Sequence, residues 1–351
     1  MPYAQNNLTM KQSNKVIISA PGKLMLFGEH AVVYGRPCLA AAVDTRLSIL
    51  IKKIPQKKIK IKALQVGITD FQKSLESIRL QGPTLKPVDK RCCFVEAAMG
   101  NFYRKYGLKY GGKYKLDSGF ELEIKNGFSS KYGLGSSSAV TVCMIKALSE
   151  LFKVKLSKKE IFDLAYKSVL DVQGVGSGFD VAAAVWGGVL FYRSGGKEIK
   201  LLKIRKLSLV IVYSGTKADT PTLIKKVAGL RFKKFNKIEK IFDQIEKIVL
   251  KTEKSLILED KRDLRELGEL MNKNQKLLAS LGVSSPKIDL LVKAALSAGA
   301  YGAKLSGAGG GDCIIALVSK EKRHLVEQAL VKTGGVLVPV ETGAEGVRKE
   351  L

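Results

Sequence analysis

The chain has 351 residues, which is enough for one large domain or two medium-sized ones, because single hydrophobic cores stop growing at about 250 to 300 residues. Apolar residues make up 46% of the chain and charged residues 26%, a composition that excludes global disorder. The formal net charge is +28, which raises the hypothesis that the protein binds nucleic acid or another anionic surface.

The basic residues lie in short clusters along the whole chain, with acidic residues between them and no known nucleic-acid-binding motif. A solvated lysine-rich surface is the simpler interpretation, so no specific nucleic acid is expected. The first fifteen residues are polar and no apolar run approaches the roughly 20 residues that span a bilayer, so we expect a cytoplasmic protein without membrane contact. Five cysteines without a CxxC pair indicate buried free thiols.

The N-terminal half is expected to alternate strands and helices irregularly. A flexible polar tail over 1–14 precedes strands over 16–20 and within 38–61, helices over 90–104, 139–152 and 158–170, and a strand over 187–192. Pro21-Gly22 follows the first strand, and Ser157 with Glu160 forms a capping-box pattern before the third helix.

A lysine-rich polar segment over 194–203 is the predicted link between two domains, 15–198 and 199–351. Beyond it we expect a strand over 207–213, a helix opened by Thr220-Pro221, a long amphipathic helix over 236–257, a helix after Pro286, and then a strand, a helix and a strand over 312–318, 320–332 and 335–341. This order favours an α+β fold, and no repeat of about 20 to 50 residues indicates a solenoid.

Two glycine-rich segments carry the first chemical signals. Gly133-Leu134-Gly135-Ser136-Ser137-Ser138-Ala139 leads into an apolar helix, so it is either a phosphate-binding loop or an ordinary serine-capped helix start. The Walker and Rossmann patterns are both excluded, since GxxxxGK[ST] is missing and 174–179 ends in Phe where GxGxxG needs Gly. Segment 304–313 has four glycines in five positions, which indicates either a loop pressed against a ligand or a backbone, or a plain hairpin.

Charged residues within apolar surroundings give the other signals. Lys23, Glu29 and His30 interrupt an apolar strand-like run and need partners, which suggests a site, although a structural histidine is the alternative. Asp180 precedes an apolar helix and is either a candidate general base or simply an N-cap or a partner of the dipole at the helix N-terminus.

Together these segments resemble, in order and spacing over nearly the whole chain, the three motifs of the GHMP kinases, the family of galactokinase, homoserine kinase, mevalonate kinase and phosphomevalonate kinase. PGKLMLFGEHAVVYGRP at 21–37 resembles the first motif in its mevalonate kinase form, GLGSSSA at 133–139 the second, and KLSGAGGGDC at 304–313 the third. Residues 270–286 and 172–174 are also similar to mevalonate kinases, the latter to archaeal members.

The resemblance implies an N-terminal domain like ribosomal protein S5 domain 2 and a C-terminal ferredoxin-like domain, with the active site between them. It also implies ATP- and Mg²⁺-dependent phosphorylation of mevalonate. A kinase for phosphomevalonate or a sugar is the alternative, and a basic nucleic-acid-binding protein on a kinase fold is the second alternative. The oligomeric state is left open between a monomer and a homodimer.

The resemblance also implies roles for single residues. Asp180 is the general base, and Lys23 stabilises the nucleophile's developing charge and keeps Asp180 ionised. Ser137 helps to hold Mg²⁺. The nucleotide is bound by Gly133, Leu134, Gly135, Ser136, Ser137, Ser138, Gly307, Ala308 and Gly309. Glu29 and His30 lie near mevalonate, and Thr220 is either an active-site residue or a helix N-cap.

The sequence departs from the family pattern at one expected ligand of the metal ion. Mevalonate kinases carry a Glu as a second Mg²⁺ ligand where this chain has Val169, so either Asp171 or oxygens of ATP and water take its place. Ser177-Gly178-Phe179-Asp180 and Gly311-Asp312-Cys313 resemble phosphomevalonate kinases, whereas His30 favours mevalonate.

Overall fold

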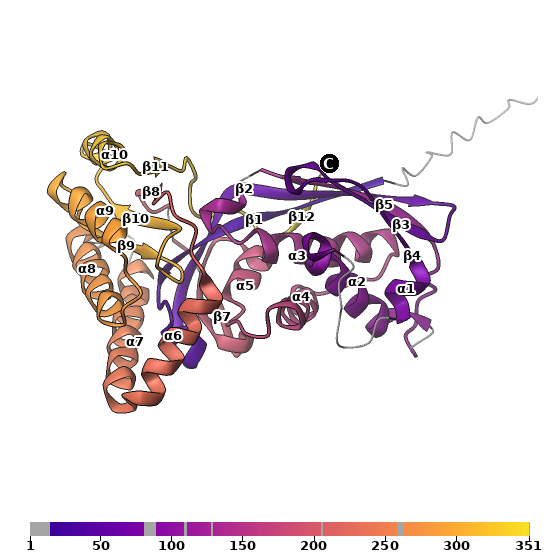
Figure 1. Ribbon diagram of the computed structural model, residues 1–351, viewed down its shortest axis with the longest axis horizontal. Helices are drawn as coiled ribbons and strands as arrows, with labels where there is room; N and C mark the ends of the chain where they lie inside the picture. The colour runs from indigo at the N-terminus through magenta and orange to yellow at the C-terminus, as the bar shows by residue number, and fades with distance from the viewer. Residues whose placement is uncertain are drawn as a thin grey trace, which may run out of the picture.

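The computed structural model describes residues 15–80, 89–108, 111–127, 129–204, 206–257 and 263–350, so the expected tail over 1–14 lies outside the described residues. Two sheets, of eight and four strands, organise the described part. Figure 1 shows the larger sheet above helices α1 to α5, and the smaller sheet among helices α6 to α10 at the other end of the molecule. In the described part of the chain, no helix is both long and apolar enough to cross a membrane.

The larger sheet has the order β12-β1-β2-β5-β3-β4, with β6 also paired to β2 and β7 paired to β6. Its strands are β1 Lys15–Phe27, β2 Pro37–Ile54, β3 Lys58–Ala63, β4 Ile68–Ser74, β5 Gly119–Asn126, β6 Val189–Arg193, β7 Glu198–Leu202 and β12 Arg348–Lys349. β1 does not end at Pro21-Gly22. It continues past them with a shift of register, because an irregularity of this kind accommodates a proline in a strand.

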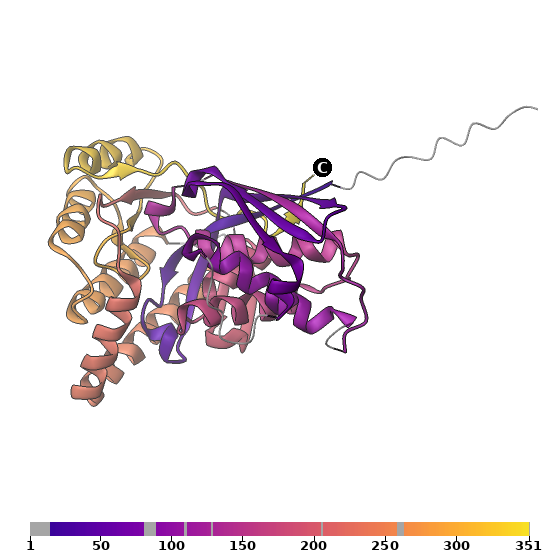
Figure 2. The ribbon, with the colours of Figure 1, turned by 45° about the vertical axis from the view of Figure 1, so that its right-hand side comes forward.

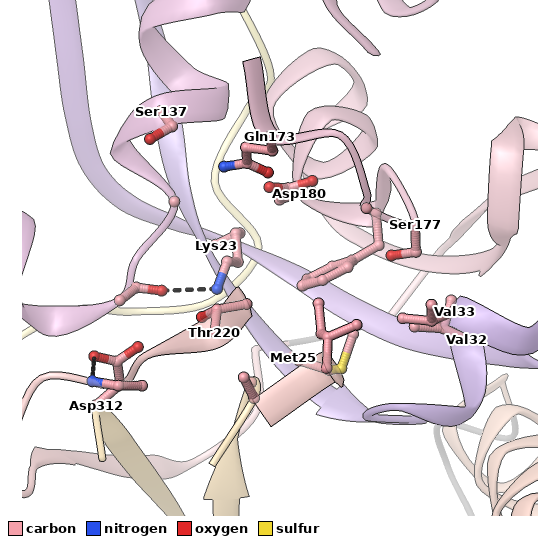
Figure 3. Close-up of a pocket in the computed structure, with 18 of the residues that line it drawn as sticks. Lys23, Met25, Val32, Val33, Ser137, Gln173, Ser177, Asp180, Thr220 and Asp312 are labelled. Carbon is pink, nitrogen blue, oxygen red and sulfur yellow. Dashed lines mark hydrogen bonds between the residues drawn. The ribbon is translucent and has the colours of Figure 1, made fainter. Parts of the chain in front are cut away.

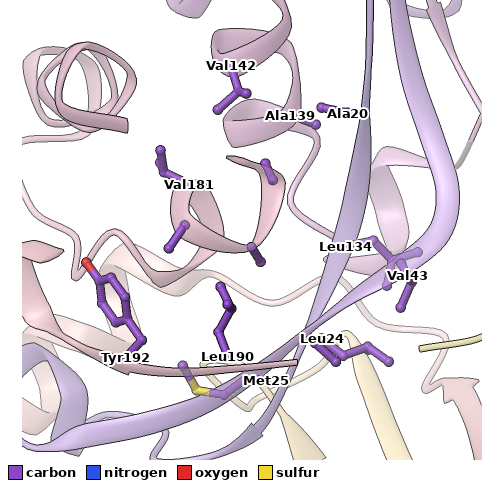
Figure 4. Packing of buried hydrophobic residues seen from close by; sticks show 14 of the residues in the cluster. Ala20, Leu24, Met25, Val43, Leu134, Ala139, Val142, Val181, Leu190 and Tyr192 are labelled. Atoms are coloured by element: carbon purple, nitrogen blue, oxygen red, sulfur yellow. The ribbon is translucent and has the colours of Figure 1, made fainter. Parts of the chain in front are cut away.

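The predicted helices of the N-terminal half are confirmed and cover one face of this sheet, as Figure 2 shows. The confirmed helices are α2 Cys93–Tyr106, α3 Ser136–Leu151 and α4 Lys158–Gln173, and the same face also carries α1 Leu75–Leu80 and α5 Phe179–Trp186. The capping box is also confirmed, since the Ser157 hydroxyl accepts from the Glu160 N–H and the Glu160 carboxylate accepts from the Ser157 N–H. Figure 4 shows buried side chains of β1, α3, α5 and β6 packed together.

The smaller sheet has the antiparallel order β11-β8-β10-β9. It consists of β8 Leu209–Tyr213, β9 Gly302–Ser306, β10 Cys313–Leu317 and β11 Val336–Leu337, with helices α6 Thr220–Lys233, α7 Phe235–Ile257, α8 Leu264–Ser280, α9 Pro286–Ser297 and α10 Arg323–Lys332. Neither α8 nor β9 was expected from the sequence, and the strand predicted over 335–341 is shorter, covering only Val336–Leu337.

Half of the segment 194–203, predicted as the link between the domains, is β-structure rather than an irregular linker. β7 begins at Glu198 and pairs antiparallel with β6, so it extends the larger sheet. The chain also returns to this sheet at its end, where Lys349 lies opposite Ile18 of β1. We therefore propose that the first unit includes β7 and the last strand, and that the chain crosses to the second unit between β7 and β8.

The two units meet along β1 and β9. The Met25 N–H donates to the Ser306 hydroxyl at 3.1 Å, and that hydroxyl donates to the Met25 carbonyl at 2.9 Å. Beyond β1, the Glu29 carboxylate forms an ion pair with the ammonium of Lys304 on β9, and both side chains are fully buried. The Asn274 amide of α8 donates to the second oxygen of Glu29 at 3.1 Å. This buried pair joins the two units.

We expect Lys304→Met to be strongly destabilising, because it leaves the Glu29 carboxylate buried without its counter-ion. The expected loss is roughly 3–5 kcal/mol in the free energy of unfolding, measured by urea denaturation at neutral pH. Lys276→Met removes an exposed lysine of α8 and should change that energy by less than about 0.5 kcal/mol. A Lys304→Met loss no larger than this control would contradict the assignment.

Candidate active site

A cavity of about 250 Å³ lies where the two units meet. Its walls come from β1, the start of α3, the end of α4, the start of α5, the segment before α6 and the glycine-rich segment before β10 (Figure 3). Ten predicted site residues line it: Lys23, His30, Gly133, Gly135, Ser136, Ser137, Asp180, Thr220, Gly307 and Ala308. Four others are placed behind this wall: Glu29, Leu134, Ser138 and Gly309.

The loop before α3 has the backbone of an anion site. Gly133 and Gly135 have φ angles of 70° and 84°, in the left-handed region that other residues rarely adopt. The residue that precedes α3 is Gly135, which has no side chain to cap the helix, so the serine-capped alternative is wrong here. Ser136 and Ser137 therefore bring the N-terminal end of a long helix to the cavity, where its dipole and N–H groups favour anions.

Lys23 of β1 is attached to this loop twice. Its backbone N–H donates to the Leu134 carbonyl at 2.8 Å, and its ammonium donates to the Gly133 carbonyl at 2.7 Å. Burial lowers the pKa of Lys23 below that of an ordinary lysine, and the nearby Asp180 and Asp312 carboxylates oppose this shift. Lys23 is thus a half-buried cation whose charge depends on its acidic neighbours.

Asp180 is the second residue of α5, two positions beyond the Gly178 cap. Gly178 is the cap of this helix, so the N-cap alternative for Asp180 is wrong, whereas its place in the first turn is consistent with the dipole-partner alternative. One carboxylate oxygen accepts from the Ser138 hydroxyl at 2.5 Å, and the other accepts from the Val181 N–H at 3.0 Å. Ser138 therefore orients Asp180 from behind the cavity wall, a contact that the sequence did not indicate.

Glu29 and His30 are neighbours with different surroundings. The His30 ring lines the cavity, and its Nε2 lies 2.9 Å from the carbonyl oxygen of Ala308, which requires the proton on Nε2. Burial lowers the pKa of His30. The prediction that Glu29 contacts the substrate does not match its position, because its carboxylate contacts Lys304 and Asn274 behind the wall.

Thr220 is the first residue of α6 and lines the cavity. The N-cap alternative for Thr220 is wrong, because Asp219 is the cap and accepts from the Thr222 N–H at 3.2 Å. In the glycine-rich segment, Gly307 faces the cavity with open space around its α-carbon. Gly309 instead is pressed against a backbone, since a β-carbon there would lie 2.1 Å from the Val283 carbonyl oxygen.

Of the two alternatives for the missing metal ligand, the one that uses Asp171 does not fit its position. Val169 lines the cavity, whereas the Asp171 carboxylate faces α2 and accepts from the Asn101 amide at 2.8 Å. Lys167 lies 3.1 Å from the same carboxylate. Within the described residues, no group of three or more His, Cys, Asp or Glu side chains could hold a metal ion.

Several residues of the wall were not predicted as site residues. Asp312 and Lys217 add one acidic and one basic side chain, and Gln173 and Ser177 add polar groups. Asp312 directly follows the glycine run, so its position next to that motif was a usable signal. Lys217 resembles many other exposed lysines of this chain, and nothing in its local pattern distinguishes it.

A second cavity, of about 230 Å³, adjoins the first and was not predicted. The two cavities share Ser136 and Ser137 at the start of α3. The wall of the second cavity is mostly apolar and includes Leu47, Ile61, Ile68, Phe94 and Val140, with Asn126 among its polar members.

Comparison with known proteins agrees with this geometry. The GHMP kinases N terminal domain matches residues 94–188, and the GHMP kinases C terminal domain matches residues 254–336. The chain is 35% identical to mevalonate kinase of Pyrococcus furiosus over 340 residues, covering 96% of this chain and 98% of the relative. It is 37% identical to mevalonate kinase of Thermococcus onnurineus over 345 residues, covering 96% and 98%.

Among solved structures, that of Methanococcus jannaschii mevalonate kinase matches with a TM-score of 0.79 and 28% identity, covering 95% of this chain and 100% of the other. The expected α+β fold is thereby confirmed, with two sheets that correspond to the N- and C-terminal domains. The chain belongs to the GHMP kinase family.

Proposed function

We propose that this protein is a mevalonate kinase, which converts mevalonate and ATP to 5-phosphomevalonate and ADP. Full-length similarity to archaeal mevalonate kinases, at about 35% identity, supports this activity. The observation that carries the proposal is the convergence of Lys23, the start of α3 and Asp180 on one cavity, although these segments lie far apart in the sequence.

The two adjoining cavities suggest how ATP is bound. The mostly apolar second cavity suits a purine ring, and its polar members can hydrogen-bond the base edge. Ser136 and Ser137 belong to both cavities, so phosphates attached to a base in the second cavity would reach the N-terminus of α3. The γ-phosphoryl group would then lie in the first cavity, on the side of Asp180 and Lys23.

The acceptor occupies the remaining part of the first cavity, between His30, Val33 and Thr220. Asp180 takes the proton of the acceptor hydroxyl as that oxygen forms a bond to the γ-phosphorus. The bond between this phosphorus and the β–γ bridging oxygen breaks, and ADP leaves with the bonding electrons. The Lys23 ammonium stabilises the negative charge that develops on the attacking oxygen, and Ser138 keeps Asp180 oriented.

Mg²⁺ enters this proposal as part of MgATP, in which it neutralises charge on the β- and γ-phosphates. The Ser137 hydroxyl lies on the cavity wall at the start of α3 and is the side chain that we propose to hold the ion. A small number of protein ligands is enough for Mg²⁺ here, because this ion keeps several waters and binds through substrate phosphates. A cytoplasmic location and the choice between monomer and homodimer stay predictions.

The acceptor is tested by measuring ADP release with mevalonate, phosphomevalonate, homoserine and galactose under identical conditions. We expect kcat/KM to be highest with mevalonate, because the full-length relatives are mevalonate kinases and His30 lines the acceptor side of the cavity. Highest turnover with phosphomevalonate would contradict the choice of acceptor while leaving kinase activity intact.

The base is tested with Asp180→Asn, which keeps the shape of the side chain but cannot accept the proton. We expect kcat to fall by about a hundredfold or more, with MgATP affinity nearly unchanged. Asp171→Asn is the matched control, because Asp171 contacts α2 outside the cavity, and it should keep kcat near wild type. Near wild-type kcat in Asp180→Asn would rule out Asp180 as the base.

A further inference from the structure

Asp312 is a buried carboxylate of the cavity wall that the proposed reaction does not yet use. It lies between the glycine-rich segment and β10, is 9% exposed, and has a φ angle of 55°. This left-handed backbone is tolerated by Asp, Asn and Gly better than by most other residues. A residue that served only the turn would not need its charge inside the cavity.

On one side, Asp312 holds the segment that leads to α6. Its N–H donates to the Thr216 carbonyl at 2.7 Å, and its carbonyl accepts from the Ser214 N–H at 2.8 Å. One carboxylate oxygen accepts from the Ala218 N–H at 3.0 Å. Because Thr220 follows two residues later and lines the cavity, these three hydrogen bonds set the position of Thr220.

On its other side, Asp312 faces the phosphate-binding loop. A β-carbon on Gly133 would lie 2.4 Å from the second carboxylate oxygen, so this oxygen is pressed against the loop. The Gly133 carbonyl is the acceptor of the Lys23 ammonium. Figure 3 shows Lys23 between Asp180 and Asp312, which enter from opposite sides.

We propose that Asp312 is a positioning residue for phosphoryl transfer, whose charge supports the Lys23 ammonium opposite Asp180 and whose hydrogen bonds hold the segment carrying Thr220. This role rests on the proposed kinase function. The titratable groups that act on Lys23 come from three elements: Asp180 on α5, Asp312 and Cys313 at β10, and Lys217 before α6. The two carboxylates raise the pKa of Lys23 against the larger effect of burial, and Lys217 lowers it.

These opposing influences on the pKa of Lys23 determine the direction in which a substitution of Asp312 should shift it. Burial lowers the pKa of Lys23, and the Asp312 carboxylate opposes this effect. Removing the charge of Asp312 therefore lowers the pKa of Lys23 further, so that Lys23 loses its proton at a lower pH. The reaction needs the ammonium form, so the alkaline limb of the kcat profile should move to lower pH. Asn and Gly both tolerate the left-handed backbone, so neither substitution should prevent folding.

Two substitutions separate the charge from the hydrogen bond. Asp312→Asn removes the charge but retains an oxygen for the Ala218 N–H, whereas Asp312→Gly removes both. We expect both variants to shift the alkaline limb to lower pH, and only Asp312→Gly to raise KM for mevalonate, by about tenfold. Asp219→Asn is the matched control, since Asp219 caps α6 outside the cavity, and it should behave like wild type.

The decisive measurement is the titration of Lys23 itself by NMR, in protein with ¹³C-labelled lysine and no substrate, with the signal assigned from a Lys23→Arg variant. If Lys23 titrates in Asp312→Asn as in wild type, the proposed charge role is overturned. If Asp312→Gly keeps the KM of Asp312→Asn, the proposed positioning role is overturned. The titration of Lys23 does not depend on turnover. A wild-type protein without kinase activity would contradict the proposed function, and that result is separate from the outcome of the titration.

Discussion

The buried ion pair between Glu29 and Lys304 determines how the two units of this protein meet, and the active site depends on that meeting. Each charge is removed from water, so each requires the other at close range. The pair fixes the end of β1 against β9, one residue before His30 and shortly before the glycine-rich segment. Together with the hydrogen bonds between Met25 and Ser306, this contact holds the two walls of the cavity together.

The same arrangement explains why short loops can carry the chemistry. Lys23 binds the phosphate loop through its backbone and its ammonium, and His30 contacts the glycine-rich segment through the Ala308 carbonyl. Ser138 holds Asp180 from behind. Each reactive side chain is thus oriented by a residue from a different part of the chain. Phosphoryl transfer relies mainly on positioning and charge, so a rigid set of contacts of this kind suits it.

The structure gives a simpler interpretation of the high net charge than the composition does. Most of the described lysines are exposed, and many form ion pairs on the surface, such as Lys159 with Asp163 and Lys206 with Glu341. Exposed pairs of this kind contribute little to stability. Two cations lie instead at the junction of the units, where Lys304 is fully buried and Lys23 is half-buried.

Much of the site could be predicted from the sequence, because local patterns determine local backbone. The glycines before α3 and the capping box of α4 follow from spacing and backbone freedom, and the order of the three motifs was available through the resemblance to the GHMP kinases. Which side chains meet was decided only by the tertiary structure. Glu29 faces away from the cavity and Asp312 faces into it because β1, β9 and β10 pack in one particular way, and contacts between such distant segments leave no periodic signal in the chain.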